Sequence, residues 1–110
     1  MATARIITAE LFLQHTDHGR PTEIIVLHAT LTQQDGHWVG VCLELGTSAY
    51  ASTTEEALQE LTDAILLQLD EVEKLGFTNL FLADHNVQRV AVPEKTSHSD
   101  PRRWKQLAGV

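Results

Sequence analysis

The sequence has few of the residues that stabilise small proteins through covalent or metal bonds. It contains one cysteine, Cys42, together with three prolines and 5% aromatic residues. A single cysteine excludes an internal disulfide and a multi-cysteine metal knuckle, so the fold must depend on its hydrophobic core. A chain of 110 residues, 43% of them hydrophobic, is long enough to bury roughly 65% of its unfolded surface around one core. We therefore expect one domain, suited to the reducing cytoplasm.

Basic residues and long apolar runs are scarce as well. Eight lysines and arginines stand against fifteen acidic residues, giving a formal net charge of −7. Residues 1–93 hold four basic and thirteen acidic residues, a balance of −9, whereas residues 94–110 carry +2. An acidic body repels phosphate backbones and attracts basic partners, so direct nucleic-acid binding by the main domain is not expected. No apolar run reaches the ~20 residues of a membrane span, and the N-terminus lacks the regions of a secretory signal, so we expect a cytoplasmic protein.

The positions of glycine and proline, together with the alternation of apolar side chains, predict an antiparallel sheet. Residues 24–31 carry apolar side chains on both alternating faces, which is typical of a strand covered on two sides. Asp35 and Gly36 then form a tight hairpin signal. The polar stretch 15–22 contains glycine and proline and is predicted to be a loop. The expected strands are residues 5–13, 24–31, 37–43, 48–51 and 87–92.

The clearest predicted element is a helix over residues 54–75. Thr53 and Glu56 have the spacing of a capping box, and Gly76 is the expected stop. One face is an apolar stripe about 30 Å long, formed by Ala57, Leu58, Leu61, Ala64, Ile65, Leu69 and Val72. The opposite face carries Gln59, Glu60, Asp63, Asp70, Glu73 and Lys74. This acidic face fits either a solvated surface or a docking surface for a basic partner.

Together these elements predict an α+β fold, in which an antiparallel sheet of three to five strands packs on one long helix. The domain is expected to span residues 1–93, with residues 5–13 as an extra N-terminal strand. One face of residues 24–31 should pack on the helix. The other face needs cover from residues 5–13 and 100–108 or from a second copy, because monomers seldom expose a large apolar patch. Of these, we favour dimerisation.

Two further segments follow the long helix. Residues 77–86 have the pattern of a short helix capped by Thr78. Its apolar side is expected to consist of Phe77, Leu80 and Phe81. Residues 94–110 are expected to form a tail, in which a proline at the first helical position favours a short helix over residues 101–108.

Residues 34–76 combine several motifs in a distinctive order. An Asp-Gly hairpin leads into a strand with Trp38 and Cys42, then into the turn Cys42-Leu43-Glu44-Leu45-Gly46, and then into the helix start Thr53-Thr54-Glu55-Glu56-Ala57-Leu58. This order resembles the HicB-like antitoxin family, with the similarity covering residues 24–76. The resemblance implies a truncated ribonuclease H-like fold that binds and neutralises a small basic ribonuclease toxin. We therefore expect a non-enzymatic protein-binding domain, without cofactor or metal, that forms homo-oligomers.

Three departures separate the sequence from the family pattern. The turn at residues 42–46 lacks the prolines found in many members, and Ala51 replaces a glycine before the helix. After Pro93 only 17 residues remain, too few for an added DNA-binding domain, so direct operator binding is not expected. These departures leave open an alternative, a solitary HicB-like domain without a toxin that acts as a homo-oligomeric scaffold or regulator.

Five residues are candidates for partner binding. The carboxylates of Glu44, Glu60 and Asp63 would pair with basic groups of a toxin, and the two tryptophans, Trp38 and Trp104, would add aromatic contacts. Glu44 alternatively is a carboxylate that stabilises its turn. Trp104 lies beside three basic residues and also fits a stacking platform for nucleic acid. For Trp104 we favour an anchor that packs on the domain or on a neighbouring subunit.

The histidines and the cysteine have structural interpretations that we favour over catalytic or metal-binding ones. His28 lies in an apolar strand and is expected to be a hydrogen-bonded interior histidine or part of an interface. His15, Asp17 and His18 have the chemistry of zinc ligands, but a solvated loop is expected there. Cys42 is expected to pack as a small apolar residue, because a nucleophilic cysteine needs a base and a lowered pKa. The expected central strand also lacks the clustered carboxylates of a nuclease metal site.

Overall fold

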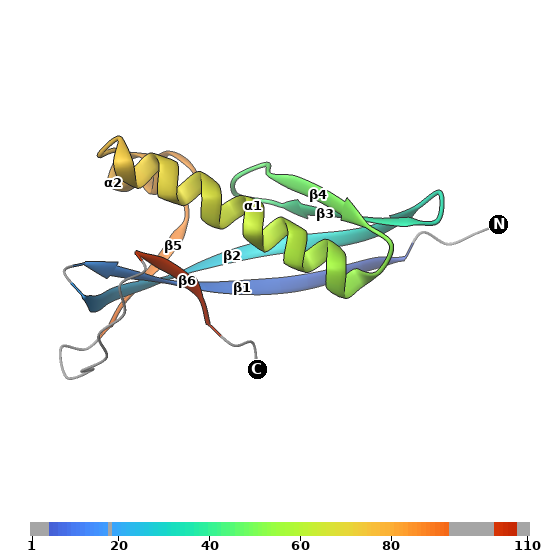
Figure 1. Ribbon diagram of the computed structural model, residues 1–110, viewed down its shortest axis with the longest axis horizontal. Coiled ribbons are helices and arrows are strands. Elements are labelled where there is room, and N and C mark those ends of the chain that lie inside the picture. The colour runs from blue at the N-terminus through green and yellow to red at the C-terminus, as the bar shows by residue number, and fades with distance from the viewer. Residues whose placement is uncertain (1–4, 18, 93–102, 108–110) are drawn as a thin grey trace.

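The computed structural model describes residues 5–17, 19–92 and 103–107. Within them, a curled antiparallel sheet of six strands and two helices form an α+β fold (Figure 1). The elements in chain order are β1 (Ile6–Asp17), β2 (Arg20–Gln34), β3 (His37–Cys42), β4 (Ser48–Ala51), α1 (Thr54–Lys74), α2 (Thr78–Asp84), β5 (Gln88–Ala91) and β6 (Trp104–Gln106). The sheet is larger than the three to five strands predicted. Beside the one long helix of the predicted fold, the short helix expected within residues 77–86 is present as α2.

β2 is the central strand of the sheet. The strand order is β4-β3-β2-β1-β6, and β5 also pairs with β2. β1 follows one edge of β2, while β3 pairs with residues 29–34 and β5 with residues 23–26 along the other edge. Leu27 and His28 therefore lie in a gap between two partner strands. This gap is where the candidate site forms.

The hairpin of β1 and β2 is longer than predicted, and the loop predicted at residues 15–22 is wrong. β1 continues to Asp17 and β2 begins at Arg20. The register shifts between His15 and Thr16, which places Pro21 opposite Thr16 at the irregularity. A proline is tolerated there because a bulge position does not require its missing N–H. The polar residues thus extend the ribbon instead of ending it.

The tail also differs from its prediction. Residues 104–106, expected to be helical, form β6 on the outer edge of β1. The unpaired backbone of that edge offers hydrogen bonds that a short isolated helix in water would lack. The remaining residues of the predicted helix at 101, 102 and 108 lie outside the described residues.

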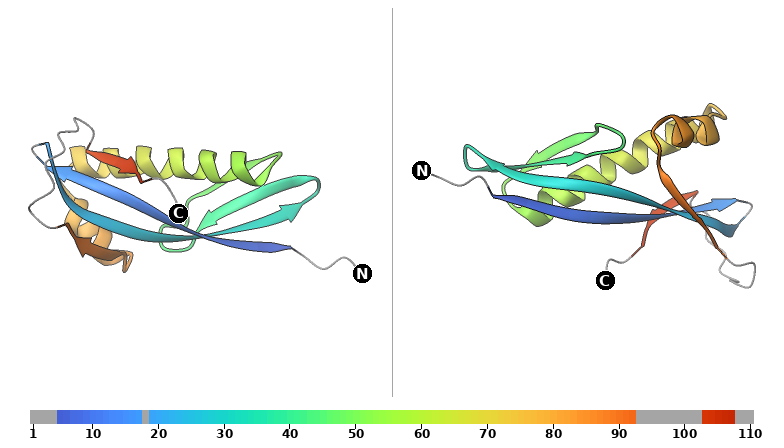
Figure 2. Two further views of the ribbon diagram at one scale, coloured as in Figure 1. Left: turned by 90° about the horizontal axis from the view of Figure 1, so that it is seen from below. Right: turned by 180° about the vertical axis from the view of Figure 1, so that it is seen from behind.

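α1 runs along one side of the long β1–β2 ribbon (Figure 2). Its predicted apolar stripe is confirmed at Leu61, Ile65 and Leu69, which are fully buried, while Leu58 is half-buried against the same core. The helix comes close to β3 at Gly40, where an added Cβ would lie 3.4 Å from Leu61 Cδ2 and 3.7 Å from the Ala57 carbonyl oxygen. The core that results contains Leu11, Leu13, Ile25, Leu27, Ala29, Cys42, Leu61, Ile65, Leu69, Leu82, Val87 and Trp104.

The start of α1 is capped as predicted. Thr53 has an extended backbone, and its Oγ1 accepts a hydrogen bond from the Glu56 N–H at 3.1 Å. We expect Thr53→Ala to lower the free energy of unfolding by about 1 kcal/mol, because one helical N–H loses its partner. Urea denaturation followed by circular dichroism measures this. Thr53→Ser keeps the oxygen and is expected to match the wild type, so equal losses in both variants would contradict the cap.

α2 turns a different side inward from the one predicted. Phe77 and Leu80 are exposed, whereas Leu82 is fully buried in the core. Of the predicted side, only Phe81 packs against the core, where it is half-buried. Thr78 does not cap the helix but donates a hydrogen bond to Glu73 Oε1 at 2.6 Å. The sharp turn at Gly76, with a φ of 76°, sets the direction of α2, and that direction decides which side meets the core. The predicted strand over residues 87–92 is confirmed as β5.

Candidate functional site

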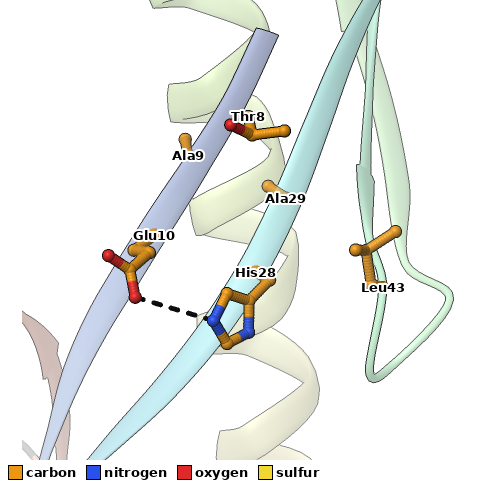
Figure 3. Close-up of a pocket in the computed structure, with 6 residues that line it drawn as sticks. All are labelled: Thr8, Ala9, Glu10, His28, Ala29 and Leu43. Carbon is orange, nitrogen blue, oxygen red and sulfur yellow. Dashed lines mark ion pairs between the residues drawn. The ribbon is translucent and has the colours of Figure 1, made fainter. Parts of the chain in front are cut away.

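The sheet face opposite α1 holds a cluster of three titratable side chains. Because Leu27 and Ala29 are buried in the core, His28 between them projects to the opposite face. Glu10 lies across from His28 on β1, and Glu44 approaches from the turn after β3. Figure 3 shows the hollow beside this cluster, about 410 Å³ in volume, lined by Thr8, Ala9, Glu10, His28, Ala29 and Leu43.

Glu44 fills the gap that β3 and β5 leave along β2. Its Oε1 accepts a hydrogen bond from the His28 backbone N–H at 2.8 Å, and its Oε2 lies 2.5 Å from His28 Nδ1. The Leu43 N–H donates to the His28 carbonyl at 2.8 Å. One carboxylate therefore replaces a missing strand partner and orients an imidazole. Glu44 is thus a turn-stabilising carboxylate. His28 is hydrogen-bonded as expected, but it is not interior, because its side chain is 44% exposed.

The pKa values of the pair move in opposite directions. The hydrogen bond to Glu44 raises the pKa of His28 above its usual 6.5 against some desolvation, and the charges of Glu44 and Glu10 add to this effect. Burial alone would raise the pKa of Glu44, but hydrogen bonds from the His28 side chain and backbone outweigh it and leave that pKa below the usual 4.5. Both shifts favour an ion pair of imidazolium and carboxylate.

The outer side of the imidazole faces a second acid. Glu10 Oε2 lies 3.6 Å from His28 Nε2, and its side chain is 59% exposed. Burial raises the pKa of the nearby Cys42 thiol, which keeps it protonated and a poor nucleophile. Among the residues that line the hollow, Thr8 carries the only hydroxyl. The imidazole thus lies between two carboxylates, with its Glu10 side open to solvent. This arrangement fits charge pairing more closely than a nucleophile and its base.

A second feature lies at the edge strand β4, which pairs with β3 alone among the described strands. Glu60 of α1 lines a shallow hollow there with Val39, Ser48, Ala49 and Tyr50. Tyr50 is 73% exposed. Glu56, Glu60 and Asp63 follow one another at helical spacing and are all exposed, and we call them the acidic stripe. An open strand edge and a row of carboxylates thus adjoin each other.

The candidate residues from the sequence fall in four separate places. Glu60 and Asp63 belong to the acidic stripe, where Asp63 also accepts a hydrogen bond from Gln59 at 2.9 Å. Trp38 is half-buried in β3 opposite Ala51 of β4. Glu44 is engaged with His28 on the other face of the sheet. Trp104 is 6% exposed and belongs to the core, so the anchoring interpretation is confirmed and stacking on nucleic acid is not available to it here.

His15, which resembled a zinc ligand in the sequence, makes other contacts at the end of β1. His15 stacks on Trp104 with ring centroids 4.3 Å apart, and its Nε2 lies 3.0 Å from Glu73 Oε1. His18 lies outside the described residues. Within the described ranges, no group of three or more ligating side chains has the geometry to hold a metal ion. Sequence reasoning missed the roles of Glu10 and Glu73, because each depends on a partner that is distant in the sequence.

Comparison of the chain with protein-family models, with curated proteins and with solved structures finds no match. The similarity to HicB-like antitoxins thus rests on the sequence motifs alone. No helix in the described part of the chain is long and apolar enough to cross a membrane.

Proposed function

We propose that the chain is a HicB-like antitoxin, a non-enzymatic protein-binding domain that neutralises a small basic ribonuclease in the cytoplasm. Its fold in this proposal is the truncated ribonuclease H-like fold. The observation that carries the proposal is the open edge of β4 beside the acidic stripe of Glu56, Glu60 and Asp63. A basic partner would add backbone hydrogen bonds to the strand and pair its cations with the stripe.

Neutralisation would follow from simple exclusion. A ribonuclease needs an exposed basic surface to hold the phosphates of RNA. An acidic surface docked on it occupies the same cations and blocks access to the active site. Trp38 and Tyr50 lie on β3 and β4 and would supply aromatic area to the contact, as aromatic residues do in many interfaces. Glu44 would contribute indirectly, by fixing the turn that leads into β4.

We expect Glu60→Lys to weaken capture of the basic partner by about tenfold, equivalent to about 1.4 kcal/mol, while the fold is retained. The measurement is co-purification of the tagged protein at low and high salt, with mass analysis of every retained protein. Asp84→Lys makes the same charge change on α2, away from the stripe, and serves as the control. Equal losses in both variants would show that only net charge matters. If Glu60→Lys retained a small basic protein as well as the wild type does, the acidic stripe would not be part of the interface.

A second candidate function is a solitary homo-oligomeric scaffold or regulator. It is favoured by the sheet face opposite α1, because β1 lies beside β2 instead of covering it. Ile6, Leu43 and Val90 are 63%, 60% and 45% exposed. Retention of only its own subunits in the same co-purification would favour this function. An adjoining open reading frame for a small basic protein would favour the antitoxin.

A further inference from the structure

Residues 103–107, which we call the strap, close the outer edge of β1. The Thr16 N–H donates to the Arg103 carbonyl at 2.7 Å, and the Leu107 N–H donates to the Phe12 carbonyl at 2.9 Å. The strap thus joins the sheet by backbone bonds, as extended peptides do when they add a strand to a domain. These bonds hold any sequence, so selectivity must come from the side chains.

The tryptophan of the strap is buried. Trp104 is 6% exposed and belongs to the main core. Its ring stacks on His15 at a centroid distance of 4.3 Å and an interplanar angle of 21°. The ring is well packed, but not every polar group around it has a hydrogen-bond partner. His15 Nε2, Thr16 Oγ1 and Trp104 Nε1 are buried without hydrogen-bond partners among the described residues, so the strap is held less tightly than a fully matched ligand would be.

The arginine of the strap meets a prearranged acid. Arg103 Nη1 lies 3.2 Å from Glu73 Oε2 and 3.6 Å from Asp17 Oδ1. Glu73 is only 18% exposed, although its helical spacing predicted a solvated residue. Its Oε1 accepts a hydrogen bond from Thr78 Oγ1 at 2.6 Å, and His15 Nε2 lies 3.0 Å from the same oxygen. The protein therefore holds one carboxylate oxygen in place and turns the other toward an arginine.

We propose that residues 13–17 of β1, together with Glu73, form a binding site for extended peptide segments in which an arginine is directly followed by a tryptophan. The strap is the resident ligand of this site, tethered to it in the same chain. A partner protein that presents such a segment displaces the strap and adds its own strand to β1. The inference does not depend on the antitoxin proposal, because it rests on contacts that the strap makes here.

The tether explains why displacement needs a competitor of good fit. The strand order β5-β2-β1-β6 places the ends of the connecting segment about 14 Å apart, at three strand spacings. Eleven residue steps from Val92 to Arg103 can span about 36 Å. This length is sufficient to reach the site, so the strap competes with a free peptide as an intramolecular ligand. A free peptide of equal fit binds the wild-type protein poorly unless the strap is weakened.

The test uses the full chain with Trp104→Ala and a fluorescent peptide, Arg-Trp-Lys-Gln-Leu, blocked at both ends. We expect the variant to bind this peptide about tenfold or more tightly than the wild type, because its own strap no longer fills the site. Adding Glu73→Gln to this variant is expected to weaken peptide binding by about tenfold, since a charge-assisted hydrogen bond is lost. The peptide Glu-Trp-Lys-Gln-Leu has the same aromatic residue and is expected not to bind.

Three results would overturn the proposal. The first is a folded Trp104→Ala protein that binds no peptide, and the second is equal binding of both peptides. The third is a wild-type dimer that Trp104→Ala converts to monomers, which would assign the site to the strap of a second copy. Should Trp104→Ala fail to fold, Lys105→Pro provides the same test, because it keeps the tryptophan and removes a strand N–H opposite Gln14.

Discussion

Leu61→Asp is expected to abolish the cooperative thermal transition of the domain. Leu61 is fully buried between α1 and the sheet, where its Cδ2 lies 3.4 Å from the Cβ position of Gly40. The substitution removes apolar contacts worth about 2–5 kcal/mol and places an unpaired carboxylate in the core, which destabilises by about 3–5 kcal/mol more. Together these losses match the whole stability of a typical domain, about 5–15 kcal/mol. Thermal scans by circular dichroism measure the effect.

The control for this prediction is Leu67→Asp, on the other side of the same helix. Leu67 is 64% exposed, so the new charge stays in water and the change of residue type is the same. We expect its transition midpoint to stay within about 5 °C of the wild type, as for most surface substitutions. If Leu61→Asp melted at the same temperature as this control, the placement of α1 on the sheet would be wrong.

The part of the fold that the sequence predicted best is α1, because its signals are local. The cap at Thr53, the stop at Gly76 and the apolar repeat all lie within one segment, so no distant contact is needed to interpret them. The Asp35-Gly36 turn is similar, since both residues adopt the positive φ values that a tight hairpin requires. Local chemistry decides these elements before tertiary packing acts.

Prediction failed where strand pairing or packing outweighed the local preference of a segment. The polar residues after His15 resemble a loop, yet pairing with β2 extends them as a strand. The buried side of α2 depends on the exit direction at Gly76, and the strand at Trp104 depends on a free edge of β1. Only the pairing of Trp104 with His15 joins segments that are far apart in sequence, whereas the other two contacts form within a few residues. In each case the tertiary contact outweighed the local preference of the segment.

The candidate site has the same origin. His28 and Glu44 are 16 residues apart, and only the pairing of β2 with β3 brings them together. A lone histidine in an apolar strand and a glutamate in a turn each have unremarkable local patterns. The signal that could have revealed the site is the gap between partner strands at His28. The His28 N–H has no strand partner there, so it must find another acceptor.

Stability is expected to depend on pH through the His28–Glu44 pair, and Glu44→Gln should remove that dependence. The folded pKa of His28 is raised above 6.5, so its contribution is complete below about pH 6.5 and is lost as the pH rises through the folded value. The folded pKa of Glu44 is lowered below 4.5, so its contribution is present above about pH 4.5 and is lost as the pH falls through the folded value. Both contributions coexist between these limits.

The measurement is the free energy of unfolding of wild type and Glu44→Gln from about pH 3 to pH 9, covering both titrations. We expect a difference of about 1–2 kcal/mol near pH 5.5 that shrinks toward both ends, because a charged hydrogen bond is lost but the imidazole is partly solvated. Glu10→Gln changes the exposed acid on the other side of His28 and is expected to have a much smaller effect. A difference that stayed constant with pH would mean that Glu44 acts only through the backbone N–H of His28. An equal effect of Glu10→Gln would show that Glu10, on the open side of the hollow, stabilises the charged His28 as much as Glu44 does.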